Sequence, residues 1–184
     1  LDTFEAKIDS STGELLVKGP SVMKGYYNNP ELTASVIDSD GWFHTGDIAE
    51  FDEDGRLYIT GRIKNMVVLS GGKKVFPEEV EAVLENNPNF AEICVFGATR
   101  KNGAKDGTEE LMTVIVPTDE VLTKYTNVEE LEAFINHEVK ELAIRLAPYK
   151  RPVNIVVRKE PLPRTATRKV KRNVVKEETM AVHS

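Results

Sequence analysis

Three largely apolar segments in the second half of the chain constrain its fold most. Residues 91–98 and 111–116 are almost continuously apolar, and residues 153–157 form a shorter run of the same kind. Segments of this length and composition are typical of buried β-strands. Between the second and the third run, apolar residues recur at helical spacing near 128–147. The sequence therefore predicts a three-stranded sheet with helices packed against it, an α+β fold.

Two helices are expected to cover one face of this sheet. Pro77 opens the first helix, and two acidic residues follow in its first turn, where negative charge is favourable. The second helix is expected from about Val128 to Ala147, with Thr126 and Glu129 forming a capping box. A short basic helix is expected near 170–176. The predicted buried stripe of the second helix comprises Leu131, Phe134, Ile135, Val139, Leu142 and Leu146.

The first 61 residues are predicted to be β-rich. Strands are expected at 14–18, 45–51 and 56–60, and a short helix that begins with proline at 30–37. Asp52-Glu-Asp-Gly55 predicts a tight turn, because a calcium loop would need alternating acids through a longer frame. Further along, two apolar runs flank Ser70-Gly-Gly72 and predict a second hairpin. This segment lacks the glycine spacing and the Lys-Ser/Thr ending of a phosphate loop.

Composition and charge limit the partners. A length of 184 residues gives room for one domain and part of another. The net charge is −6, but residues 158–176 carry +7, which leaves −13 for the remainder. The acidic balance disfavours nucleic acid as the principal partner, while the basic segment must face some anion. No run reaches the ~18–20 apolar residues of a membrane span, and no signal peptide is visible. Cys94 is expected to be a buried, reduced thiol, as in a cytoplasmic protein.

Three motifs carry the chemistry: Gly41-Trp-Phe-His-Thr-Gly-Asp47, Gly61-Arg-Ile-Lys-Asn65 and Thr165-Ala-Thr-Arg-Lys-Val-Lys-Arg172. Asp47 is an acid between a turn glycine and an apolar strand. Its two oxygens could accept hydrogen bonds from the two hydroxyls of a diol. On the residues alone, a turn or capping aspartate is the alternative.

In this order and at these separations, the three motifs resemble the C-terminal part of an adenylate-forming (AMP-binding) enzyme. This superfamily comprises acyl-CoA ligases, luciferases and peptide-synthetase adenylation domains. The resemblance implies that residues 1–63 are the β-rich end of a large AMP-binding domain. Residues 64–184 would be its small mobile C-terminal domain, with the hinge at Lys64. Nothing upstream in the chain supplies the family's Ser/Thr/Gly-rich phosphate loop. The chain is therefore expected to be a fragment that is inactive by itself.

The resemblance also implies a role for each matching residue. Asp47 would hold the ribose hydroxyls of ATP, and Arg62 would contact ribose and phosphate. Lys169 would be the catalytic lysine that neutralises the carboxylate and the α-phosphate during adenylation. Gly71 and Gly72 would lie against the pantetheine arm of CoA. The residue before the lysine is usually glycine in the family and is arginine here.

Each role has an alternative. Arg62 could form only a surface ion pair, which contributes little to stability. Lys64 could be an ordinary solvated lysine, and the Gly71-Gly72 pair a simple turn. The basic segment around Lys169 could be a solvated patch or a contact to anionic lipid.

The function implied by the resemblance is that of an ATP-dependent acyl-CoA ligase. Such an enzyme activates a fatty acid as acyl-AMP and transfers the acyl group to CoA. Residues 64–81 resemble long-chain fatty acid ligases in particular. The implied cofactors are ATP, CoA and Mg²⁺, with Mg²⁺ held by the phosphates and by residues outside this chain. The implied partners are the fatty acid and the missing N-terminal domain, with no nucleic acid.

Two other functions stay open. One is an adenylation domain that loads a carrier protein. The other is a non-catalytic module whose basic tail binds anionic partners. A cytoplasmic location is expected, and peripheral contact with a membrane is a further alternative.

Overall fold

The computed structural model describes residues 3–99 and 109–182. The chain divides into two compact units, Leu1–Lys64 and Asn65–Ser184, here called the N-terminal unit and the C-terminal unit. Each unit is described by itself.

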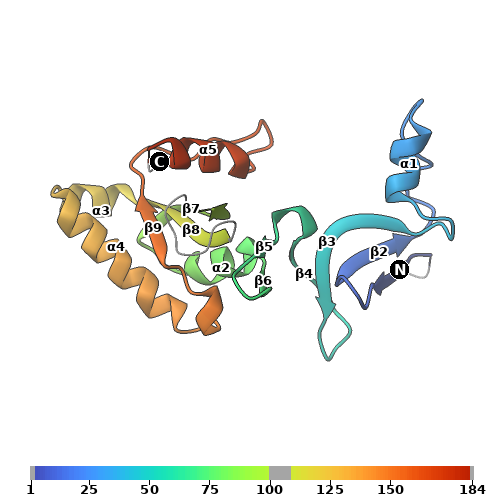
Figure 1. The fold of residues 1–184 in the computed structure, drawn as a ribbon, viewed down its shortest axis with the longest axis horizontal. Coiled ribbons are helices and arrows are strands. Elements are labelled where there is room, and N and C mark those ends of the chain that lie inside the picture. The colour runs from blue at the N-terminus through green and yellow to red at the C-terminus, as the bar shows by residue number, and fades with distance from the viewer. Residues whose placement is uncertain (1–2, 100–108, 183–184) are drawn as a thin grey trace. The chain divides into compact units, whose positions relative to one another are not determined.

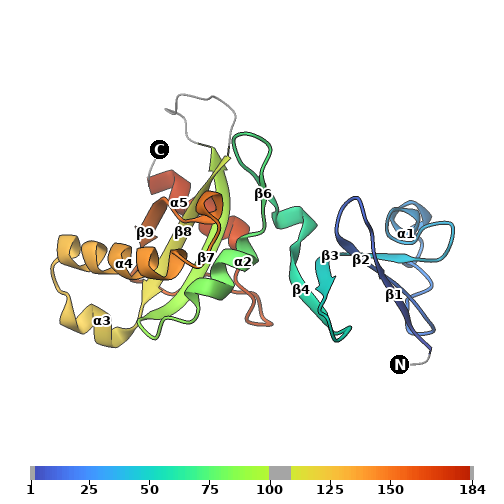
Figure 2. The same cartoon turned by 90° about the horizontal axis from the view of Figure 1, so that it is seen from below.

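The described part of the N-terminal unit contains an antiparallel sheet of four strands in the order β1-β2-β3-β4 and one helix, α1 (Figures 1 and 2). The turn between β3 and β4 contains Gly55 at φ +75°, and the backbone N–H of Asp52 donates to the carbonyl of Arg56 at 3.0 Å. This confirms the predicted turn. Asn29 caps α1 by accepting a hydrogen bond from the N–H of Leu32. The elements are β1 (Glu5–Ile8), β2 (Glu14–Lys18), α1 (Pro30–Val36), β3 (Phe43–Phe51) and β4 (Leu57–Arg62).

The C-terminal unit is built on the three predicted strands, which its described residues arrange in the order β7-β8-β9. β7 (Phe90–Thr99) pairs antiparallel with β8 (Glu109–Pro117), and β9 (Asn154–Val157) pairs parallel with β8. A hairpin of β5 (Val67–Val68) and β6 (Lys74–Val75) precedes the sheet. The α+β prediction, with its sheet, hairpin and packed helices, is confirmed.

Helices cover both faces of this sheet (Figures 1 and 2). α2 (Pro77–Leu84) and α4 (Val128–Ala143) pack on one face with the inward side chains of β7 and β8. α5 (Arg172–Val182) packs on the other face through Val175. The prediction of two helices on one face is right for α2 and α4. The basic helix, expected at 170–176, starts later, is longer, and closes the second face. A short helix, α3 (Asp119–Lys124), precedes α4.

The capping prediction for α4 is wrong. Asn127, not Thr126, is the N-cap, and its Oδ1 accepts from the backbone N–H groups of Glu129 and Glu130 at 2.8 and 3.2 Å. The helix also ends at Ala143 rather than at Ala147. Ala147 precedes a proline, whose ring disfavours helical backbone in the residue before it.

The core of the C-terminal unit holds the side chains that the periodicity selected. Ile135 and Val139 of α4 are fully buried, and Leu131 is 1% exposed. Burial of each such side chain contributes roughly 1.5–3 kcal/mol. Cys94 is 1% exposed on the opposite face of the sheet, and burial raises the pKa of its thiol to about 12. No helix in residues 3–99 and 109–182 is long and apolar enough to cross a membrane.

Candidate functional site

Asp47 and Arg62 lie side by side in the N-terminal unit. They are direct partners in the register of β3 and β4, and Arg62 Nε lies 2.7 Å from Asp47 Oδ1. The side chains are 23% and 46% exposed for Asp47 and Arg62 respectively, so both reach solvent. An ionised carboxylate next to a cation matches a hydroxyl-rich, phosphorylated ligand. The hairpin register thus brings together the two residues that the resemblance assigns to the ribose of ATP.

Glu14, which was assigned no role from the sequence, supports the turn that presents Asp47. This carboxylate is 8% exposed, and its Oε1 accepts from the backbone N–H of Gly46 at 2.8 Å. Its Oε2 lies 3.0 Å from His44 Nδ1. Thr45 adds a further contact by donating to the carbonyl of Leu15 at 2.8 Å. The only signal in the sequence was a buried-strand position occupied by glutamate.

Lys169 is exposed at the end of a hydrogen-bonded turn in the C-terminal unit. The N–H of Thr165 donates to the carbonyl of Lys169 at 2.8 Å, and the N–H of Lys169 donates to Thr165 Oγ1 at 3.1 Å. Among the residues that the structure describes, no hydrogen bond or ion pair engages the Lys169 ammonium. The backbone of the turn is therefore ordered, while its ammonium is free to meet an anion.

Arg168 adopts the backbone conformation that glycine favours. Its φ is +64°, and the left-handed region costs about 1–2 kcal/mol for a residue with a side chain. Its N–H donates to the carbonyl of Thr165 at 2.9 Å, and its carbonyl accepts from Arg164 Nη1 at 2.6 Å. These contacts hold the turn in place although arginine replaces the glycine that the resemblance leads one to expect.

Two arginines anchor the two sides of the Lys169 turn to the sheet and to α2. Arg164 Nη2 lies 2.7 Å from Glu92 Oε1 on β7. Arg172 donates from Nη2 to both oxygens of Glu81, at 2.7 and 2.6 Å. Burial works against the Arg172 cation, but the facing carboxylates prevail and raise the pKa of its guanidinium. Neither anchor was assigned from the sequence, because the partners lie 72 and 91 residues apart.

Gly71 and Gly72 form the turn of the β5–β6 hairpin. Their φ angles are +87° and +76°, which only glycine adopts without strain. The N–H of Gly72 donates to the carbonyl of Leu69 at 3.0 Å. Among residues 3–99 and 109–182, no atom would lie within 4 Å of a Cβ added at either glycine, so the positive φ angles account for both residues.

Lys64 lies in a one-turn 3₁₀ helix, Ile63–Asn65, and it is exposed. It is the last residue of the N-terminal unit, and Asn65 is the first residue of the C-terminal unit. The backbone at this point is the only covalent connection between the two units.

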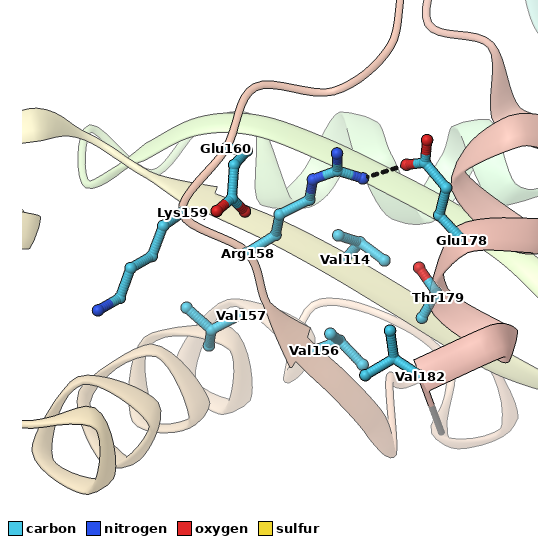
Figure 3. Close-up of a pocket in the computed structure, with 9 residues that line it drawn as sticks. All are labelled: Val114, Val156, Val157, Arg158, Lys159, Glu160, Glu178, Thr179 and Val182. Carbon is cyan, nitrogen blue, oxygen red and sulfur yellow. Dashed lines mark hydrogen bonds and ion pairs between the residues drawn. The ribbon is translucent and has the colours of Figure 1, made fainter. Parts of the chain in front are cut away.

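A cavity of about 450 Å³ lies between β9 and α5 (Figure 3). Val114, Val156 and Val182 give it an apolar lining, and Arg158 is paired with Glu178 at 2.6 Å across it. None of the residues assigned from the sequence lines this cavity. Lys159 and Glu160 also line the cavity, so its charged groups are of both signs.

No group of three His, Cys, Asp or Glu side chains that could hold a metal ion occurs within residues 3–99 and 109–182. We therefore derive no step through a metal held by these residues. Within the N-terminal unit, Asp47 and Arg62 present a carboxylate and a guanidinium that both reach solvent, and within the C-terminal unit Lys169 presents an exposed ammonium.

Comparison with known proteins gives a consistent assignment. Residues 79–169 match the family model of the AMP-binding enzyme C-terminal domain. The long-chain-fatty-acid–CoA ligase of Bacillus subtilis (strain 168) is 39% identical over 183 residues, covering 99% of this chain and 30% of that protein. The indoleacetate–CoA ligase of Aromatoleum aromaticum is 37% identical over 167 residues, covering 91% of this chain and 29% of that protein.

A solved structure gives the same answer for the fold. The A-PCP didomain of carboxylic acid reductase from Segniliparus rugosus, in complex with AMP, superposes with a TM-score of 0.80 at 27% identity. The match covers 98% of this chain and 28% of that structure. The chain thus spans about 30% of the length of the curated relatives it matches. It belongs to the adenylate-forming, AMP-binding enzymes, and it carries their C-terminal domain.

Proposed function

We propose that the chain is the C-terminal portion of an AMP-forming acyl-CoA ligase. The intact enzyme would join a carboxylic acid to ATP, release pyrophosphate, and transfer the acyl group from acyl-AMP to CoA. The observation that carries this proposal is Lys169, an exposed cation on an ordered turn with no ion pair among the described residues. The similarity to CoA ligases at 37–39% identity supports the reaction class.

In this proposal, each of the assigned residues has a separate role in binding or catalysis. Asp47 accepts the ribose hydroxyls, and Arg62 donates to ribose and phosphate oxygens. Lys169 lies between the attacking carboxylate and the α-phosphate, where its charge offsets the repulsion of two anions. Lys64 is the hinge that turns the small domain between the two half-reactions. Gly71 and Gly72 lie along the pantetheine arm of CoA.

ATP and CoA are the proposed cofactors, with Mg²⁺ bound to the phosphates by groups outside this chain. The proposed acid is a long-chain fatty acid, which the resemblance of residues 64–81 favours. The relatives include an indoleacetate ligase as well, so chain length is the finer part of the proposal. A cytoplasmic location fits the buried thiol of Cys94, which is 1% exposed.

A second candidate is an adenylation domain that loads a carrier protein. The fold match to the A-PCP didomain of carboxylic acid reductase favours it. The two candidates share acyl-AMP formation and differ in the thiol that accepts the acyl group. Free CoA and a carrier protein, each offered to preformed acyl-AMP, would distinguish them.

The proposal is tested by assaying pyrophosphate release from ATP with acids of graded chain length. The intact ligase should release pyrophosphate fastest with long-chain acids and form the corresponding CoA thioesters. The 184-residue chain alone should release none, because no phosphate loop is present in its sequence. Acid-dependent acyl-AMP formation by the chain alone would contradict this account of how the site is divided. A preference for short or aromatic acids would contradict the proposed substrate.

A further inference from the structure

Glu78, in the first turn of α2, contacts two segments that are far apart in the sequence. Its Oε1 accepts hydrogen bonds from Asn65 Nδ2 and from Arg172 Nη1, the latter at 3.2 Å. Asn65 is the residue directly after Lys64, and Arg172 directly follows the segment that carries Lys169. One carboxylate oxygen therefore joins the start of the C-terminal unit to the end of the Lys169 segment.

The Arg172 side of this junction is rigid. Besides its two bonds to Glu81, Arg172 donates from Nε to the carbonyl of Val95 at 2.8 Å. Glu81 Oε1 in turn accepts from the N–H of Val95 at 2.7 Å. The planar guanidinium is thus fixed on several sides, with its side chain only 21% exposed. A group held this way gives the adjoining turn a fixed reference point.

The charges explain why the cation needs more than one acid. Arg172 is the first residue of α5, where the helix dipole is unfavourable to positive charge. Lys169 and Lys171 add further positive charge close by in the sequence. Glu81 and Glu78 supply the two compensating carboxylates from α2. In the first turn of α2, Glu78 is itself favoured by the dipole of its own helix.

Glu78 binds Arg172 through fewer oxygens than Glu81 does. Both oxygens of Glu81 bind Arg172, whereas Glu78 Oε2 has no hydrogen-bond partner among the described residues. Glu81 binds Arg172 with both oxygens, and Glu78 adds a second ion pair to Arg172 at 3.2 Å. Glu78 also adds the connection to Asn65.

We propose that Glu78 is a positioning residue that ties the Lys169 turn to the segment following Lys64, so that the two move as one body. This inference rests on the proposed role of Lys169 in adenylation. Because a misplacement of about 1 Å can lower a rate by about a hundredfold, a turn that must deliver an ammonium gains from such a tie. A loose turn would reach the same anion in fewer of its conformations.

The chain offers a matched control one residue away. Glu79 occupies the same turn of α2 but pairs with Lys150 and does not contact Arg172 or Asn65. The test compares Glu78→Gln with Glu79→Gln in the 184-residue chain by ¹⁵N relaxation. Glutamine keeps an acceptor oxygen but removes the negative charge that faces Arg172. Glu78→Gln should therefore lower the order parameters of the amides of residues 165–171 from about 0.85 toward 0.6, and shift the Asn65 side-chain amide. Glu79→Gln should change neither signal.

Unchanged order parameters in Glu78→Gln, or equal changes in both variants, would overturn the inference. Arg172→Lys gives a second route if Glu78→Gln does not fold. A lysine keeps the charge but cannot hold Glu81 and Glu78 together in a planar fork, so the same loosening is expected. An Arg172→Lys chain with a rigid Lys169 turn would equally overturn the tie.

Rate measurements on the intact ligase distinguish this inference from the proposed function. There, Glu78→Gln should slow acyl-AMP formation about tenfold and leave thioester formation from preformed acyl-AMP unchanged. A loosened turn with an unchanged adenylation rate would uphold the tie and refute the catalytic role of Lys169. A rigid turn would refute the tie whatever the enzyme does.

Discussion

Replacing Lys169 by alanine in the intact ligase should slow acyl-AMP formation by about 10²–10³-fold, as expected for loss of one preorganised charged donor. The physical reason is repulsion, because the carboxylate must approach an α-phosphate that is also negative. The exposed ammonium is the group that can neutralise both. Single-turnover pyrophosphate release measures this step. Thioester formation from preformed acyl-AMP should be largely unaffected.

Lys171 provides the matched control for this substitution. It is exposed, carries the same charge and lies two residues further along the chain. Lys171→Ala should leave both half-reactions near their original rates. An equal loss of both half-reactions in Lys169→Ala, or the larger loss in Lys171→Ala, would contradict the assigned role.

Replacing Lys64 by proline should impair the second half-reaction far more than the first. Proline locks φ near −65° and removes the backbone N–H, whereas a hinge must change its backbone dihedral angles. Lys64 lies in a 3₁₀ turn at the boundary of the two units, so a locked dihedral acts on the only covalent link between them. Thioester formation should fall by about two orders of magnitude if closure is prevented.

Lys64→Ala separates the backbone from the side chain. Alanine keeps the dihedral freedom and removes only the ammonium, so both half-reactions should continue. The two rates are measured separately, from ATP and acid and from acyl-AMP and CoA. A Lys64→Pro enzyme that makes thioester normally would show that Lys64 is not the hinge.

Most strands and both hairpin turns could be predicted because their signals are local, whereas β1 (Glu5–Ile8) was not predicted. Apolar runs define β7 and β8, and Asp-Gly and Gly-Gly pairs define the two turns. The cap of α4 was mispredicted because Thr126 and Asn127 are adjacent and both are good capping residues. Only the backbone geometry decides between them. Similarly, α5 buries only Val175 and Thr179, so its bounds depended on the sheet face that it covers.

For the candidate site too, residues in local motifs could be predicted and residues with distant partners could not. Asp47, Arg62 and Lys169 stand in recognisable motifs, so each could be named from the sequence. The supporting acids could not, because their partners are distant in the chain: Glu14 reaches Gly46, and Glu92 reaches Arg164. Such pairings are set by strand register and helix docking, which a single sequence does not determine.

The central claim is that a positive charge at position 169 drives adenylation, and restoring that charge chemically tests it most directly. In Lys169→Cys ligase, alkylation with 2-bromoethylamine places an ammonium on a side chain of nearly lysine length. Cys94 should be spared, because it is 1% exposed and its thiol pKa is raised to about 12. Aminoethylation should restore most of the pyrophosphate release, whereas iodoacetamide, which adds a neutral amide, should not. Equally slow release after both treatments, with wild-type enzyme unaffected by either reagent, would contradict the claim.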